Sequence, residues 1–172
     1  GGVEESRLES SSLELHLDEL VSEVDEMMHT IHRTYGETSE VKDLDMTYLH
    51  LMGRHYIRTG EYEKGVRNIL SLVEIASEVR NLDYLLMGYK QMIYYDIQIG
   101  NTEEMRNYLE LALNVADECN YHKEMGILLR LKGLNMIMQG NFSEAERLLK
   151  ESISTFMVTQ SVQRRYALNI AG

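Results

Sequence analysis

The apolar residues of the chain recur at every third or fourth position, not at every second one. In the stretch MRNYLELALNVA a single apolar stripe is formed by Met105, Tyr108, Leu109, Ala112, Leu113 and Ala116. Such spacing follows the turn of an α-helix and is typical of an amphipathic helix. The chain contains no proline to interrupt a helix, and it lacks the glycine-rich hairpin turns of a β protein. We therefore predict an all-α fold.

An internal period of 40 residues appears when the chain is aligned on Gly60, Gly100 and Gly140. An isoleucine stands three positions before each glycine, and aliphatic residues recur nine and thirteen positions after it. Glycine suits the left-handed backbone at the C-terminal end of a helix. Possible capping boxes follow two of the glycines, with the pairs Asn101 and Glu104, Asn141 and Glu144, or Ser143 and Glu146. Each glycine is therefore expected to mark a tight turn between two helices.

The period predicts pairs of helices. We expect A helices at about 42–59, 83–99 and 122–139, and B helices at about 61–79, 102–119 and 142–157. Gly53 and Gly133 precede the turn glycines by seven positions, and we expect them where the B helix of the same repeat crosses closely. One pair cannot bury its own apolar stripe, so stacked pairs should form a right-handed α-α superhelix, or solenoid.

One such array is expected over residues 1–172. Its three repeats are predicted at 42–79, 83–119 and 122–157. Residues 12–35 are expected to be the B helix of a preceding repeat, and 161–172 the start of the next A helix. The array would then be a fragment of a longer one, and its cut ends could pair to form a homodimer.

The first repeat, YLHLMGRHYIRTGEYEKG, carries Leu49, Gly53, Tyr56, Gly60 and Tyr62. These residues resemble the large, small, aromatic, glycine and aromatic positions of the tetratricopeptide repeat family, in its elongated form of about 40 residues. The third repeat is similar at Gly133, Gly140, Phe142 and Ala145. The second departs from the pattern at Ile93 and Asp96, and no repeat ends in the family's proline. HEAT and armadillo pairs, which have a similar period, remain alternatives.

The composition limits the partners and the location that we expect for this chain. The formal charge of -11 argues against binding of nucleic acid by this segment, because phosphate binding needs clustered Lys and Arg. No long apolar run suggests a membrane span or a signal peptide. The single cysteine, Cys119, cannot form an internal disulfide, which fits a reducing compartment. We expect a cytoplasmic location.

No set of residues predicts catalysis, so we expect no enzyme, no cofactor and no metal. His29 and His32 are spaced to share one face of a helix, but no fixed third ligand is apparent, and solvated or packing histidines are favoured. Cys119 and His122 lie near a helix end without an orienting group, so a buried, unreactive cysteine is favoured.

Charge is distributed unevenly between the two sets of helices. The chain has 28 acidic residues, but the last fourteen positions of the A helices (46–59, 86–99 and 126–139) contain only Asp96, where about seven acids would be expected. The same windows hold five basic residues, which are Arg54, Arg58, Lys90, Arg130 and Lys132. Two interpretations are open: a basic groove, or A helices that lack acids because they are buried.

Aligned on the glycines, the A helices place equivalent residues in rows, so they should face one groove side by side. The groove is expected to contain His50, Arg54, Arg58, Lys90, Tyr94, Gln98, Arg130 and Leu134. Such a surface would bind an acidic peptide or a partner domain. The alternative is an anionic metabolite in the same groove. The family resemblance implies a non-catalytic interaction module, often the sensor or assembly part of a bacterial transcription regulator or signalling protein.

Overall fold

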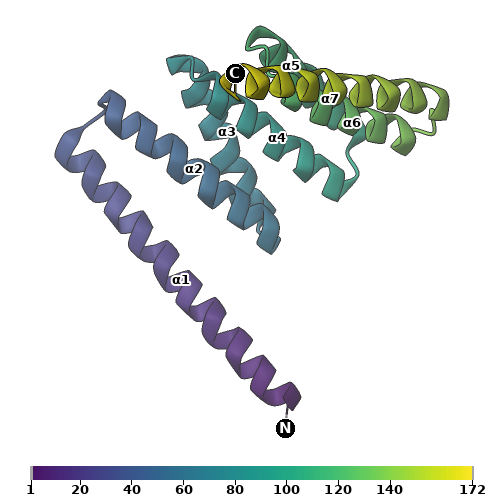
Figure 1. The fold of residues 1–172 in the computed structure, drawn as a ribbon. Coiled ribbons are helices and arrows are strands. Elements are labelled where there is room, and N and C mark those ends of the chain that lie inside the picture. The colour runs from purple at the N-terminus through teal and green to yellow at the C-terminus, as the bar shows by residue number, and fades with distance from the viewer. Residues whose placement is uncertain (1, 172) are drawn as a thin grey trace. The chain divides into compact units, whose positions relative to one another are not determined.

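The computed structural model describes residues 2–171, except for the side chains of 161–163 and 166–171. These residues form seven helices and contain no strand, which confirms the all-α prediction (Figure 1). The helices are α1 (Gly2–Tyr35), α2 (Ser39–Thr59), α3 (Tyr62–Val79), α4 (Leu82–Ile99), α5 (Thr102–Glu118), α6 (His122–Met138) and α7 (Phe142–Ala171). The predicted A helices correspond to α2, α4 and α6, and the predicted B helices to α3, α5 and the first part of α7.

Two helices are longer than the sequence analysis predicted. Helix α1 begins at Gly2, not at about residue 12, because the serines at 10–12 disfavour a helix only weakly. Helix α7 continues to Ala171 through the turn expected between 157 and 161. It contains neither glycine nor proline, so nothing in its backbone forces an end at that place. Residue 172, the last of the predicted next A helix, lies outside the described residues.

The chain divides into two compact units, Gly1–Thr47 and Tyr48–Gly172, which we call unit 1 and unit 2. In unit 1 the buried apolar side chains are Met28, Val41 and Met46, and most of α1 is exposed. In unit 2 consecutive helices from α3 to α7 pack against one another (Figure 1). Their largest fully buried apolar side chains are Ile69, Leu72, Met92, Ile93, Met105, Leu109, Leu128, Leu131 and Leu148. Unit 2 thus has a helical, repeat-like architecture.

The three turns from an A helix to a B helix have one geometry. Gly60, Gly100 and Gly140 have φ angles of 87°, 74° and 79°, in the left-handed region that glycine adopts without strain. Each glycine N–H donates to the carbonyl oxygen of the isoleucine three residues earlier, at 3.3, 3.3 and 2.9 Å. The next N–H donates to the carbonyl four residues before the glycine, which completes a Schellman motif. The turn positions are therefore confirmed. The isoleucine contributes its backbone to every turn, but its side chain is buried only at Ile57.

Two of the expected capping boxes form their side-chain N-cap, without the return bond from Glu to the backbone N–H of the cap residue. The Asn101 side-chain oxygen accepts from the Glu104 N–H at 3.1 Å, and its amide donates to the Glu104 carboxylate at 3.3 Å. Asn141 accepts from the Glu144 N–H at 3.3 Å, so the cap of α7 is Asn141 and not Ser143. These bonds satisfy N–H groups that have no partner within the first turn of a helix.

The turns from a B helix to the next A helix also repeat after 40 residues. Arg80 and Asn120 have φ angles of 56° and 55°, and they are the only described residues other than glycine with positive φ. Asparagine tolerates this conformation, whereas arginine adopts it at a cost of roughly 1–2 kcal/mol.

Replacing Arg80 with Gly is therefore expected to raise the free energy of unfolding by about 0.5–1 kcal/mol, the relief of strain less the greater backbone entropy of glycine. The ion pair of Arg80 with Glu118, at 3.9 Å on the surface, should offset little of this gain. Urea denaturation would measure the change, with Asn120→Gly as the control that gains less. A lower midpoint for Arg80→Gly than for the parent chain would contradict the strain argument.

Close helix crossings occur at the expected glycines. A Cβ atom added at Gly53 would lie 2.7 Å from Ile69 Cγ1 on α3, and one at Gly133 would lie 3.3 Å from Leu149 Cδ2 on α7. Gly65 on α3 also approaches α2 closely, and here the neighbour is backbone, because its Cβ would lie 2.9 Å from the Ile57 backbone nitrogen. The positions predicted for close contact with the B helix of the same repeat are confirmed at both Gly53 and Gly133.

Within the part of the chain that the structure describes, none of the helices combines the length and the apolar character that crossing a lipid bilayer requires.

Candidate functional site

Contacts between successive A helices repeat with the 40-residue period. The ring of His50 on α2 lies 6.4 Å from the ring of Tyr84 on α4, in an edge-on arrangement. Forty residues later, Lys90 Nζ on α4 lies 2.8 Å from a carboxylate oxygen of Glu124 on α6. The hydroxyl of Tyr121, which precedes α6, donates to Asp83 on α4 at 2.6 Å. These contacts place parts of α2, α4 and α6 next to one another in unit 2.

His50, Arg54 and Lys90 form the best-defined part of the expected groove. The pKa of His50 is lowered, first by burial and then by the positive charges of Arg54 and Lys90. Arg54 and Lys90 therefore both lie within electrostatic range of the His50 imidazole. His50 is therefore neutral at pH 7, and it contributes an uncharged ring to the expected groove. Arg54 is exposed.

The remaining expected residues are accessible on the A helices. The side chains of Arg58, Tyr94, Gln98 and Arg130 are exposed, and that of Leu134 is half-buried. Their equivalence in the repeat rows relates them to the group around His50. We call the whole set, with His50, Arg54 and Lys90, the A-helix surface. Its exposed positions carry no acid, so burial alone does not explain the missing acids.

Two of the five bases on the A helices already have acidic partners. Lys90 pairs with Glu124, and Lys132 pairs with Glu110 on α5 at 2.9 Å. Glu124 lies in the first turn of α6, just before the window in which acids were counted, so the sequence analysis overestimated the free charge at Lys90. Among the described residues, Arg54, Arg58 and Arg130 have no ion pair. These three arginines are therefore the cations most available to an anionic ligand.

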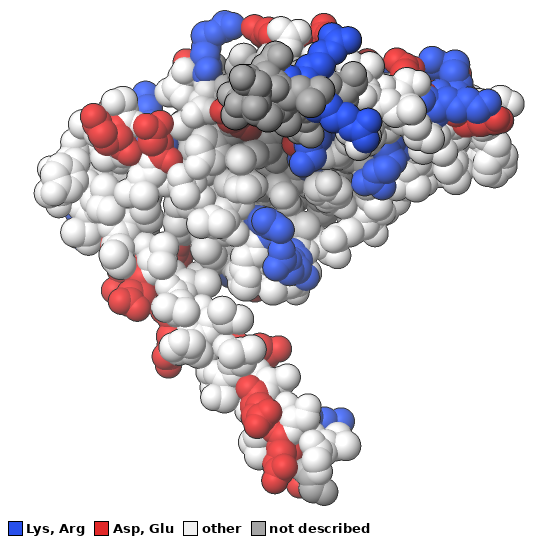
Figure 2. Space-filling view, in the orientation of Figure 1, with Lys and Arg blue, Asp and Glu red and all other residues white. Residues whose placement is uncertain are grey.

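Figure 2 shows several Lys and Arg side chains on a largely uncharged face of unit 2. Most of the Asp and Glu side chains in this view lie toward its edges, and others follow α1. The A-helix surface itself combines the exposed cations of Arg54, Arg58 and Arg130 with the uncharged side chains of Tyr94, Gln98 and Leu134. This arrangement suits an extended ligand better than a single small anion.

The one acid within the A-helix windows is inside the protein. Asp96 is fully buried on α4, and neither carboxylate oxygen has a hydrogen-bond partner among the described residues. Burial, together with the negative charge of Glu104, raises its pKa to about 7. Tyr108 also lies nearby, because its own pKa is raised by burial and by the charges of Glu104 and Asp96. Asp96 stands where the first repeat has Tyr56, so a carboxyl group replaces an aromatic ring.

A second group of polar side chains lies in unit 1, around His32. His32 Nε2 is 2.6 Å from an oxygen of Asp45, and Nδ1 is 3.0 Å from an oxygen of Glu37. The hydrogen bond and charge of Asp45 contribute most to raising the pKa of His32. The interpretation of His32 as a solvated or packing side chain was therefore incomplete, because the ring is held by two carboxylates. The sequence analysis missed Glu37 and Asp45, which only the turn between α1 and α2 brings to His32.

His29 and Cys119 do not form sites in the described structure. His29 is exposed and is not among the residues that converge with His32. Cys119 is a free thiol at the C-terminal end of α5 and is half-buried, so the expectation of a buried cysteine is only partly met. His122, three residues later, is exposed.

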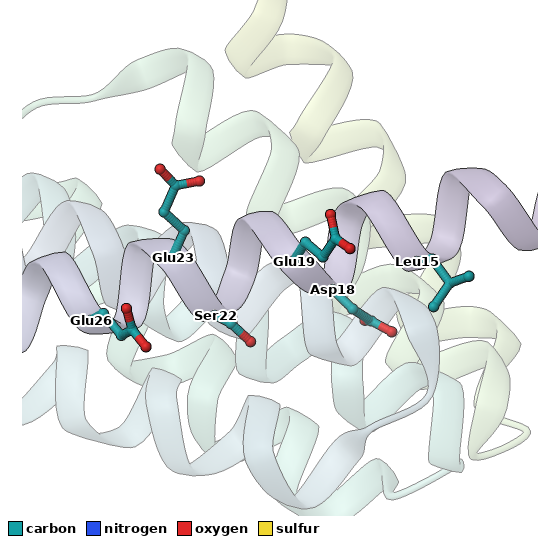
Figure 3. Close-up of a pocket in the computed structure, with 6 residues that line it drawn as sticks. All are labelled: Leu15, Asp18, Glu19, Ser22, Glu23 and Glu26. Carbon is teal, nitrogen blue, oxygen red and sulfur yellow. The ribbon is translucent and has the colours of Figure 1, made fainter.

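An acidic face of α1 forms a shallow hollow, shown in Figure 3. Its side chains are Leu15, Asp18, Glu19, Ser22, Glu23 and Glu26, all from this one helix. No basic side chain is among these residues, and their carboxylates are not among the described groups that converge closely enough to hold a metal ion. Like charges that share one helix face repel one another. This face is a solvated surface and indicates no binding chemistry.

The sequence matches no protein-family model, no curated protein and no solved structure.

Proposed function

We propose that this chain is a non-catalytic protein-interaction module that binds an acidic peptide or an acidic segment of a partner on the A-helix surface. The observation that carries the proposal is the exposure of Arg54, Arg58 and Arg130, on helices whose exposed positions in the windows bear no acid. A tetratricopeptide-like solenoid would place these residues on its concave side.

Binding would combine separate charged contacts with apolar area. Arginine binds carboxylates through two parallel N–H donors, so each exposed arginine can hold one acidic side chain. Tyr94, which is 36% exposed, offers a ring and a hydroxyl between the charged positions. Lys90 would share its charge between Glu124 and the ligand. A peptide with acidic residues separated by apolar ones fits this pattern.

The same proposal covers the biological setting. By its resemblance to elongated tetratricopeptide repeats, the chain would be the sensor or assembly part of a larger bacterial transcription regulator or signalling protein in the cytoplasm. The binding of nucleic acid would then belong to another domain, because the net charge of this segment is -11.

Charge reversal tests the proposal. The double variant Arg54→Glu and Arg130→Glu is expected to weaken the binding of an acidic peptide by more than tenfold, with an unchanged helical circular dichroism spectrum. Fluorescence anisotropy of a labelled peptide library measures the affinity. The affinity of the parent chain should fall as salt rises, because exposed charges are screened over about 8–10 Å.

Arg67→Glu with Arg106→Glu is the matched control. Both arginines are exposed, but they lie on the B helices α3 and α5, and this pair changes the net charge by the same amount. Equal losses for the two pairs would mean that net charge governs binding, which contradicts a specific surface. If citrate or a nucleotide binds and no peptide does, the ligand of this surface is an anionic metabolite and not a peptide. Thermal shift detects either ligand, since a ligand of the folded state raises Tm.

A further inference from the structure

The side chains around His32 present three metal-ligating groups from three successive segments. His32 comes from the last turn of α1, Glu37 from the connecting loop, and Asp45 from the second turn of α2. One potential ligand atom from each residue lies within 4.8 Å of the other two. All three residues belong to unit 1.

We propose that His32, Glu37 and Asp45 bind one divalent transition-metal ion of the zinc class, which fastens the end of α1 to the beginning of α2. An imidazole nitrogen and two carboxylate oxygens are ligands that zinc accepts, with water in the fourth position. This site does not depend on the peptide-binding proposal, because it lies in unit 1 and the A-helix surface lies in unit 2.

The separations fit an ion after a small movement. Tetrahedral ligands at about 2.1 Å from zinc lie roughly 3.4 Å apart, so ligand atoms within 4.8 Å of one another need to close by at most about 1.4 Å. Glu37 can make this movement, since its side chain is 69% exposed and long. The Asp45 side chain is 14% exposed and that of His32 33%, so these two form the less mobile part of the site.

The local backbone brings the three groups together. Gly36 has a φ angle of 70°, and its N–H donates to the His32 carbonyl, so α1 ends immediately after its last turn. Thr38 then accepts from the Val41 N–H at 3.3 Å and caps α2. The loop is therefore short, and it holds Glu37 close to the imidazole.

The charges are also suitable for a divalent cation. Two carboxylates face a single imidazole, and no lysine or arginine forms an ion pair with Glu37 or Asp45 among the described residues. A divalent ion would balance both negative charges. Because one imidazole offers one nitrogen to an ion, metal binding breaks one of its two present hydrogen bonds. With the ion at Nε2 beside Asp45, Glu37 must also leave Nδ1 to become the third ligand, and its exposed side chain allows this.

The test uses the full chain after treatment with a chelator. Isothermal titration with Zn²⁺ is expected to give one site per chain and to raise Tm. Glu37→Gln, at an exposed position that should not affect folding, is expected to weaken binding at least tenfold. Asp45→Asn and His32→Gln are expected to abolish the site. His29→Gln is the matched control, because His29 is an exposed histidine one turn earlier on α1, and its loss should change nothing.

Cobalt distinguishes this site from the thiol. The absorption spectrum of the Co²⁺-loaded chain should show d–d bands without a thiolate-to-metal charge-transfer band, since Cys119 is not among the three converging ligands. The proposal is overturned if the parent chain binds Zn²⁺ no more tightly than His32→Gln does. It is also overturned if His29→Gln weakens binding as much as His32→Gln, or if the cobalt spectrum shows thiolate ligation.

Discussion

Asp96→Asn is expected to raise the free energy of unfolding by about 2–4 kcal/mol at pH 8, and by less than about 2 kcal/mol at pH 5. The parent aspartate is fully buried, its oxygens have no hydrogen-bond partner among the described residues, and its pKa is raised to about 7 from the ordinary value of 3.8. At pH 8 it must ionise inside the protein. Asparagine has nearly the same volume and carries no charge, so it avoids this cost.

The sign follows from proton linkage. Between pH 4 and 7 the folded chain holds a proton on Asp96 that the unfolded chain has lost, so the stability of the parent chain falls as pH rises through this window. Each unit of pKa shift corresponds to 1.36 kcal/mol, and the whole shift corresponds to about 4 kcal/mol. The lower figure applies if the ionised side chain relaxes toward water. Glu104 and Tyr108 face Asp96 from α5, and the charge of Glu104 increases the cost.

Urea denaturation at pH 5 and pH 8 measures the free energy of unfolding of the parent chain and of Asp96→Asn. Asp117→Asn is the control, because Asp117 is exposed on α5 and its loss should leave the pH dependence unchanged. If Asp96→Asn shows the same fall in stability from pH 5 to pH 8 as the parent chain, another group must cause that fall, and the pKa of Asp96 is then not raised in the folded state.

The helix boundaries that could be predicted were those with a local cause. Gly60, Gly100 and Gly140 require a left-handed backbone, and Asn101 and Asn141 cap the next helices, so five residues defined three turns. No comparable residue occurs near 157–161. The turn expected there was extrapolated from the period alone, and α7 continues through it. A period locates the equivalent position, but a residue with a conformational preference must be present to end the helix.

The residues of the candidate sites could likewise be predicted only where a local pattern places them. The cations of the A-helix surface could be found by aligning rows, because their spacing is that of one helix. The pairing of Lys90 with Glu124 could not, since it depends on how two A helices are aligned against each other. The same holds for His32, whose partners lie across a turn. Asp96 did carry a signal, as the single acid in the windows and at an aromatic position of the repeat.

Gly65→Ala is expected to lower the free energy of unfolding by about 2–4 kcal/mol, although alanine favours a helix by about 1 kcal/mol over glycine. The added Cβ would lie 2.9 Å from the Ile57 nitrogen and 3.1 Å from the Gly53 oxygen. Both are backbone atoms of α2, so α2 and α3 must separate, and the contact between Gly53 and Ile69 loosens with them. A side chain cannot rotate away to relieve such a clash.

Gly133→Ala tests whether the nature of the neighbour decides the outcome. Its Cβ would lie 3.3 Å from Leu149 Cδ2 and 3.5 Å from the Ala145 oxygen, and the Leu149 side chain is flexible and 37% exposed. We expect a change within about 1 kcal/mol of zero, because the leucine can move and alanine favours the helix. Gly133→Leu adds too much volume and should cost roughly 1–3 kcal/mol. Denaturation midpoints separate the variants. Equal losses for Gly65→Ala and Gly133→Ala would contradict the argument, since backbone and side-chain neighbours would then resist the added methyl group alike.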